Sequence, residues 1–301
     1  MRSVRFALST ALGCAITLNA PLSAQEVVLA PSGPWLLDMA EDKCRIVRPF
    51  GEGENRHVLY FEQYEPSKAF VWLAAGPSIS QFRKGREIEY KFGPNGEEGT
   101  TGFGHVNFGN YGAAVSTIGL ITSTLTRVKM SGFPAGQVPQ PSTAPADRTQ
   151  AKAIESLTLS QRKRDDVVFQ LESLDRIFDA MDACTADLVQ SWGLDAEAIG
   201  SAQSGVVSTN LGKVAKELQA NFPEGTALGE MAIVSARIIV KSDGKIGDCK
   251  IVKRSVAKSY DLQKLVCDLI REEASFEPAI GADGAPIDGF FMYNIGLGTS
   301  W

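Results

Sequence analysis

Four cysteines limit how this chain can fold more than any other feature of its sequence. They are Cys44, Cys184, Cys249 and Cys267, while a fifth, Cys14, lies in an apolar N-terminal stretch. In an exported protein an even number of cysteines predicts disulfides, and four cysteines allow three pairings. The sequence alone does not choose among them. The spacing favours Cys249 with Cys267, since both lie in one compact β–α unit, and this leaves Cys44 with Cys184.

The N-terminus has the pattern of a secretory signal peptide. Arg2 and Arg5 precede an apolar run that ends near Leu18, and small residues lead up to Ala24. We therefore expect residues 1–24 to be removed, with no membrane span left after cleavage. An uncleaved N-terminus anchored in the inner membrane is the alternative, and the run is short for it, because a spanning helix needs ~20 residues.

Composition excludes several classes of function. The net charge of −5 gives no reason to expect nucleic acid or an anionic membrane as partner. The chain has no CxxC pair, and its two histidines, His57 and His105, lie far from every cysteine. We therefore expect no metal and no cofactor. A length of 301 residues predicts about two domains.

The first domain, residues 25–195, is expected to be rich in β-structure. Short apolar runs alternate with Gly- and Pro-containing turns, which predicts antiparallel hairpins. The expected strands are 35–38, 44–47, 57–61, 69–73, 87–92 and 113–116.

The end of this domain contains a break and a periodic segment. Residues 131–150 are rich in Pro and Gly and are expected to form an internal loop. Apolar residues then recur at steps of three and four over 162–190, which predicts one long helix. Cys184 lies on the apolar stripe of that helix, so the helix is expected to pack back on the strands through a bridge to Cys44.

The second domain, residues 196–301, has the predicted order helix, strand, strand, helix, strand. Asn210 is expected to cap the first helix, and Asp243-Gly244 to form a two-residue turn between the first two strands. The complete expectation is an α+β protein, with a β-rich domain followed by a small two-layer domain.

The C-terminal residues, from about 210 to 301, resemble the TonB C-terminal domain of the energy-transducer TonB family. The residues that carry the resemblance are Val240–Ile246, Cys249–Val252, Leu262, Cys267, Phe276–Ala279 and Asp283–Ile287. The resemblance implies a three-stranded antiparallel sheet with helices and a bridge from strand Cys249 to helix Cys267. It also implies a protein that binds and does not catalyse.

The family works by adding a partner's strand to an exposed sheet edge. The expected partner-binding edge is the final strand, made of Phe290, Phe291, Met292, Tyr293, Asn294 and Ile295. The resemblance implies a protein partner, such as an outer-membrane receptor or another envelope protein. Alternatively, the edge is covered by the first domain, or by a second copy in a homodimer.

These observations predict a periplasmic, non-catalytic interaction protein associated with TonB-type transmembrane transport in a Gram-negative cell envelope. The cleavable N-terminus and the globular first domain argue against energy transduction itself, because force transmission needs a membrane anchor and a long spacer. An envelope structural or accessory protein is the second hypothesis. A hydrolase that uses His57 or His105 is the third, although no nucleophile elbow, phosphate loop or HExxH motif occurs.

Overall fold

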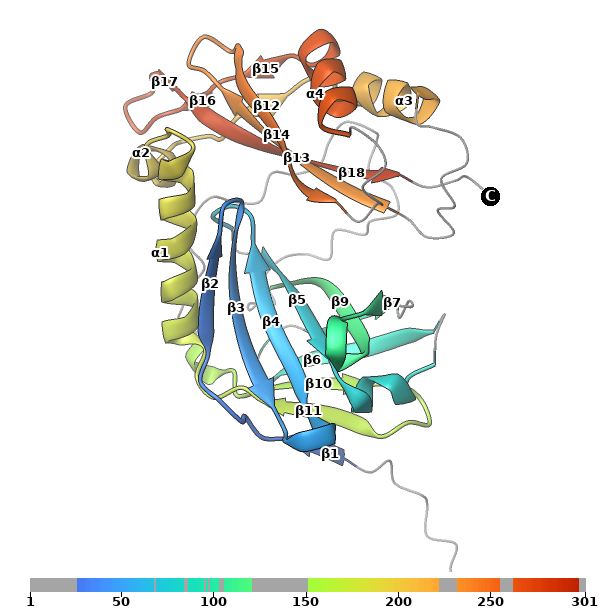
Figure 1. Ribbon diagram of the computed structural model, residues 1–301. Helices are drawn as coiled ribbons and strands as arrows, with labels where there is room; N and C mark the ends of the chain where they lie inside the picture. Colours follow the sequence, from blue (N-terminus) through green and yellow to red (C-terminus); the bar gives the residue numbers. More distant parts are fainter. Residues whose placement is uncertain are drawn as a thin grey trace, which may run out of the picture.

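The protein has an α+β fold, as the sequence predicts (Figure 1). The computed structural model describes residues 26–67, 69–83, 86–94, 96, 98–102, 106–120, 151–221, 232–254 and 262–297. The expected signal peptide and the expected loop 131–150 lie outside these residues. A β-rich domain and a smaller C-terminal domain follow each other along the chain, and helix α1 (Asp175–Ser191) extends from the first toward the second.

The first domain consists of two sheets that pack face to face. The six-stranded sheet has the order β2 (Leu36–Ala40), β3 (Lys43–Phe50), β4 (His57–Gln63), β5 (Ala69–Ala75), β9 (Ala113–Leu120) and β8 (Val106–Asn107). The five-stranded sheet has the order β1 (Glu26–Leu29), β11 (Asp166–Gln170), β10 (Ser156–Ser160), β6 (Glu87–Gly93) and β7 (Glu98–Gly102). The predicted strands and hairpins of this domain are thus confirmed.

Aromatic side chains from both sheets fill the space between them. Phe61 and Phe70 of the six-stranded sheet lie with ring centroids 5.1 Å apart, and Phe92 of the other sheet lies 5.9 Å from Phe70. Phe178 of α1 contacts the same two rings of the first sheet, at 5.7 and 5.3 Å. Buried residues alternate with partly buried ones along β3 and with exposed ones along β6, so each of these two strands has one face in this core.

The prediction of one helix over residues 162–190 is wrong in its first part. Residues 166–170 form β11, which pairs in parallel with β1 and antiparallel with β10, and α1 begins only at Asp175. Val167, Val168 and Phe169 have the β-branched and aromatic side chains that suit a buried strand. Glu172 has a positive φ of 61°, which helical backbone does not allow. Apolar spacing cannot distinguish a short buried strand from a helix, and the pairing with β1 joins residues far apart in the sequence.

The disulfide Cys44–Cys184 attaches α1 to β3. The Cα atoms are 6.0 Å apart, and both cysteines are buried in the core of the first domain. On α1, Cys184 shares its buried side with Ile177, Phe178 and Met181, so the bridge and the apolar stripe act on the same face of the helix.

The C-terminal domain is a three-stranded antiparallel sheet with two helices on one face. The order is β14 (Ile246–Arg254), β13 (Ala232–Val240) and β18 (Gly289–Leu297). Helices α3 (Leu211–Asn221) and α4 (Leu262–Glu273) lie on the side away from the first domain (Figure 1). Smaller elements complete this part: α2 (Ala196–Gly200), the pair β12 (Val207–Ser208) and β15 (Phe276–Glu277), and the pair β16 (Ala279–Ile280) and β17 (Pro286–Ile287).

The turn between β13 and β14 is longer than predicted. The backbone N–H of Lys241 donates to the carbonyl of Lys245 (2.8 Å), and that of Gly244 donates to Lys241 (2.8 Å). The loop therefore has three residues, with Gly244 in the left-handed region at a φ of 82°. Residues 281–285 repeat the same two backbone bonds, with Gly284 at 81°. Gly244 is the third residue of this three-residue loop, and glycine adopts the positive φ that this position requires.

The side chain of Asn210, which the sequence places at the start of α3, bonds to the end of α4. Its amide oxygen accepts the backbone N–H of Ser275 (2.7 Å), and its amide nitrogen donates to the carbonyl of Glu273. Glu273 is the last residue of α4, whose terminal carbonyls have no partner within the helix. Asn210 therefore joins the start of one helix to the end of the other.

The two disulfides are expected to stabilise the protein to different degrees. Cys44–Cys184 closes 140 residues and Cys249–Cys267 closes 18. The loop-entropy relation gives about 5 kcal/mol for the longer loop and about 3 kcal/mol for the shorter. Urea unfolding of the double variants Cys44→Ala/Cys184→Ala and Cys249→Ala/Cys267→Ala checks this order. A larger loss from the shorter loop contradicts it.

Candidate interaction site at the sheet edge

Strand β18 is an edge of the C-terminal sheet. It pairs with β13 over nine residues, and it contains all six residues of the predicted partner-binding edge, from Phe290 to Ile295. Within the residues that the structure describes, no strand pairs with its other side. The side chains of Phe290, Phe291, Met292 and Tyr293 are buried, while Asn294 is exposed. The backbone of this strand, and not its side chains, is thus what β18 offers at its outer edge.

The backbone direction along β18 follows from a contact on the opposite strand. Gln263 donates to the carbonyl of Cys249 on the outer side of β14. The backbone N–H and C=O groups of Cys249 therefore point away from β13. Ile238 lies opposite Cys249 on one side and opposite Phe291 on the other. In antiparallel strands the backbone groups of successive residues point alternately to the two neighbouring strands. The backbone groups of Ile238 therefore point away from β14 and bond to those of Phe291. Met292 and Asn294 therefore direct their N–H and C=O groups toward the outer edge.

One face of β18 packs against β15 and the start of α3. Phe291 packs against Phe276 at a ring distance of 5.6 Å, and Tyr293 donates its hydroxyl to the carbonyl of Leu211 (3.3 Å). Burial raises the pKa of Tyr293 to about 12, so its hydroxyl stays protonated as a donor. The strand is thus held from this side by both an aromatic contact and a hydrogen bond.

The other face of β18 packs against the first domain. Phe290, Met292 and Ile239 form a buried cluster with Val189, Leu194 and Ile199, and Trp192, at the end of α1, contacts Phe290 at a ring distance of 5.3 Å. Trp192 also packs on the core of the first domain. The first domain therefore covers one face of β18. Among the described residues no strand covers the outer backbone edge of β18.

A buried arginine lies at the centre of this interdomain contact. The guanidinium of Arg237, on β13, is 4.6 Å from the ring centroid of Trp192, and it forms ion pairs with Asp42 (3.4 Å) and Asp248 (3.5 Å). Asp42 belongs to the turn between β2 and β3, and it also pairs with Lys250 of β14 (3.0 Å). The first domain thus contacts the C-terminal sheet at two places, the end of α1 and the tip of the β2–β3 hairpin.

A second charged pair lies at the tip of the β2–β3 hairpin. Glu41 accepts from the ammonium of Lys250 at 2.6 Å. That hydrogen bond is the main cause that lowers the pKa of Glu41, and it raises the pKa of Lys250. Because Glu41 is fully exposed, the pair orients the tip more than it stabilises the protein.

Sequence reasoning missed Trp192, Arg237 and Gln263. Arg237 left a signal, since a charge inside the apolar run 231–240 indicates a polar partner on one face of the strand. Trp192 lies two residues beyond the predicted helix 162–190, a position that gives no indication of its partner. Gln263 gave no signal, because its role depends on which strand edge lies beside α4.

Of the two histidines, the structure describes only His57, and its surroundings contain backbone groups at both ring nitrogens. His57 is fully buried, its Nδ1 bonds to the carbonyl of Asn55 (2.8 Å), and its Nε2 accepts from the N–H of Ser78 (3.0 Å). Both ring nitrogens are thus engaged by backbone, and burial lowers the pKa of His57 despite the opposing bond to Asn55. His105 lies outside the described residues.

The described part of the chain shows neither a metal-binding cluster nor a membrane-spanning helix. No group of three or more His, Cys, Asp or Glu residues there is arranged to hold a metal, and no helix there is long and apolar enough to cross a membrane. A shallow depression of about 460 Å³ lies on the five-stranded sheet. Its lining includes Glu89, Lys91, Thr158, Ser160 and Asp166, but no histidine or cysteine.

Comparisons of the chain with protein-family models, with curated proteins and with solved structures found no match. The resemblance to the TonB C-terminal domain therefore stays a prediction from the sequence, on the residues named above.

Removal of Trp192 is expected to loosen the C-terminal sheet. Trp192→Ala deletes the contact with Phe290 and the cation–π contact with Arg237, together about 2 kcal/mol. Native-state hydrogen exchange of β13 and β18 amides measures the effect, with Trp192→Phe as the control that keeps an aromatic ring. Unchanged exchange in the alanine variant contradicts coupling of the domains through this side chain.

His57 is expected to make stability depend on pH. Its pKa in the folded protein is below the ordinary value of 6.5, so the fold favours the neutral ring. This contribution is fully present above the unfolded pKa, and it is lost as the pH falls below it, because the unfolded chain binds the proton first. Urea unfolding between about pH 8 and pH 5 checks this. The difference between wild type and His57→Gln should shrink toward acid pH, and a constant difference contradicts the assignment.

Proposed function

We propose that this protein is a non-catalytic binding protein of the bacterial cell envelope, whose C-terminal domain adds a strand of a protein partner to β18. The observation that carries the proposal is the outward direction of the Met292 and Asn294 backbone groups at the end of a three-stranded sheet. An extended segment can satisfy such groups without any change in the side chains beneath.

The packing around β18 supports this function. Helices hold one face of the strand, and the cluster at Trp192 holds the other. A rigid edge is already ordered before a partner arrives, which lowers the entropic cost of binding. The partner itself has to be an extended segment, since β18 offers it main-chain donors and acceptors.

The cell compartment is part of the proposal. Two disulfides place the protein outside the cytoplasm. By the resemblance of residues 210–301, we assign it to the periplasm and its partner to TonB-type transport, with an outer-membrane receptor as the first candidate. An envelope structural protein, or a second copy that pairs through β18, is the competing partner.

Asn294→Pro tests the role of the edge. Proline removes an N–H that points outward, and an edge strand tolerates it, so the fold is expected to persist. Loss of one or two backbone bonds is expected to weaken partner binding about 10-fold. Asn294→Ala keeps the N–H and removes the side-chain bond with Ser235, so it is the matched control.

The binding assay uses a photo-reactive residue at position 294 in growing cells, followed by identification of the cross-linked protein and measurement of its affinity. The proposal expects the partner to lose affinity for Asn294→Pro only. Equal affinity of both variants contradicts strand addition at β18. Capture of a receptor, of an envelope scaffold or of a second copy decides among the candidate partners.

A further inference from the structure

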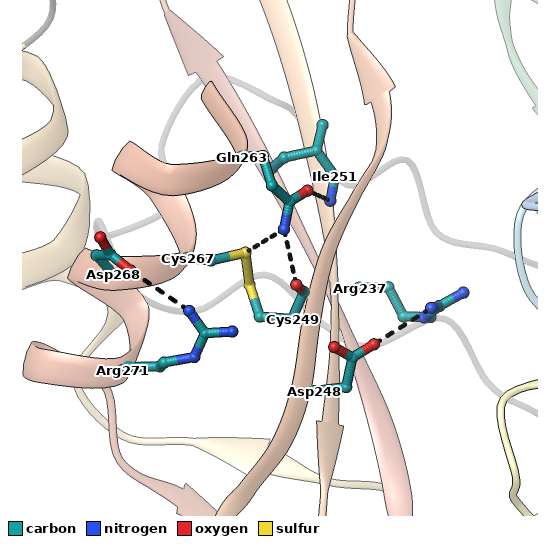
Figure 2. The surroundings of a disulfide bond; sticks show 8 residues. All are labelled: Arg237, Asp248, Cys249, Ile251, Gln263, Cys267, Asp268 and Arg271. Atoms are coloured by element: carbon teal, nitrogen blue, oxygen red, sulfur yellow. Dashed lines mark hydrogen bonds and ion pairs between the residues drawn. A yellow bond between two sulfur atoms is a disulfide. The ribbon is translucent and has the colours of Figure 1, made fainter. Parts of the chain in front are cut away.

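The C-terminal sheet has a second edge, on β14, and this edge is closed by a side chain. The amide oxygen of Gln263, on α4, accepts the N–H of Ile251 (2.8 Å), and its amide nitrogen donates to the carbonyl of Cys249 (2.9 Å). Figure 2 shows the side chain lying along the strand between these two groups. A side-chain amide carries one acceptor and a donor in the same plane, so it can take the place of a peptide group of a neighbouring strand.

The disulfide Cys249–Cys267 holds Gln263 in this position. Gln263 precedes Cys267 by four residues, so both side chains lie on the same face of α4. The bridge brings the Cα atoms of the two cysteines to 5.7 Å, and the Gln263 amide nitrogen lies 3.4 Å from the sulfur of Cys267. The helix is thus tied to β14 one turn away from the point where its glutamine meets the strand edge (Figure 2).

The residues of β14 are suited to pairing with themselves. Asp248 and Lys250 lie on either side of Cys249 and on the same face of the sheet, where Asp248 pairs with Arg237 and Lys250 with Asp42 in the single chain. When two copies of this strand pair antiparallel about Cys249, Asp248 of each copy lies opposite Lys250 of the other. Such opposite charges stabilise a cross-strand pair, and a two-fold axis doubles the contact.

We propose that Gln263 closes the β14 edge against a second copy of this chain and thereby confines strand pairing to β18. The closure of β14 is tested independently of β18, whereas the confinement of pairing to β18 rests on the proposed function. Its physical basis is that Gln263 occupies the outward groups of Cys249 and Ile251, which two antiparallel copies would need in order to pair.

Gln263→Ala in the full-length, oxidised protein tests the proposal. Light scattering over a range of concentrations measures the mass, and hydrogen exchange measures the protection of the Ile251 amide. The variant is expected to dimerise at concentrations about 10-fold below any association of the wild type, and its monomer to exchange the Ile251 amide about 10-fold faster. Lys264→Ala, a neighbouring change on α4 that leaves the edge contact intact, is expected to behave as wild type.

A second variant tests the register. Gln263→Ala/Asp248→Lys places like charges opposite each other and is expected to remain a monomer. Because Asp248 also pairs with Arg237 (3.5 Å), Asp248→Lys alone is the control that measures its effect on the melting temperature. Gln263→Met keeps the length of the side chain and removes both polar groups, and it replaces the alanine variant if that one melts at a lower temperature. Two results overturn the proposal: Gln263 variants that stay monomeric over the same concentrations as the wild type, or a dimer that persists with Asp248→Lys.

Discussion

The disulfide Cys44–Cys184 is the constraint on which the arrangement of the two domains depends. It fixes α1 to β3, and each of these elements carries a contact to the C-terminal sheet: Trp192 at the end of the helix and Asp42 at the tip of the β2–β3 hairpin. Arg237 meets both, through its cation–π contact and its ion pair. The disulfide between α1 and β3 therefore fixes the position of Trp192 relative to Asp42, and these two residues both contact the buried Arg237.

The C-terminal sheet is asymmetric in what it presents at its edges. At β14 the backbone meets Gln263, which the second disulfide holds in place. At β18 no such contact occurs among the described residues, although both faces of the strand are packed. Natural sheets protect edges with charges, bulges or covering segments, because an open edge invites association. A sheet with one protected edge and one open edge is suited to adding a partner strand at the open edge only.

The surroundings of this sheet favour binding over catalysis as the proposal. The described part of the chain brings together packing contacts and backbone edges, while its one described histidine is held by backbone on both ring nitrogens. Buried polar residues at the domain contact, such as Arg237, cost desolvation and contribute most when their partners are held in place. The ion pairs with Asp42 and Asp248 orient this arginine against Trp192, so they specify how the domains meet.

The sequence by itself determined the local features of this protein. Apolar alternation located the hairpins, compartment and spacing favoured the two cysteine pairings, and the C-terminal order of elements indicated a small sheet that ends on residues 290–295. Only the tertiary structure decided that residues 166–170 form a strand, that Asn210 serves α4, and that Gln263 closes β14. These features depend on partners distant in the sequence, and a pattern of three- and four-residue steps carries no information about which partner will lie alongside.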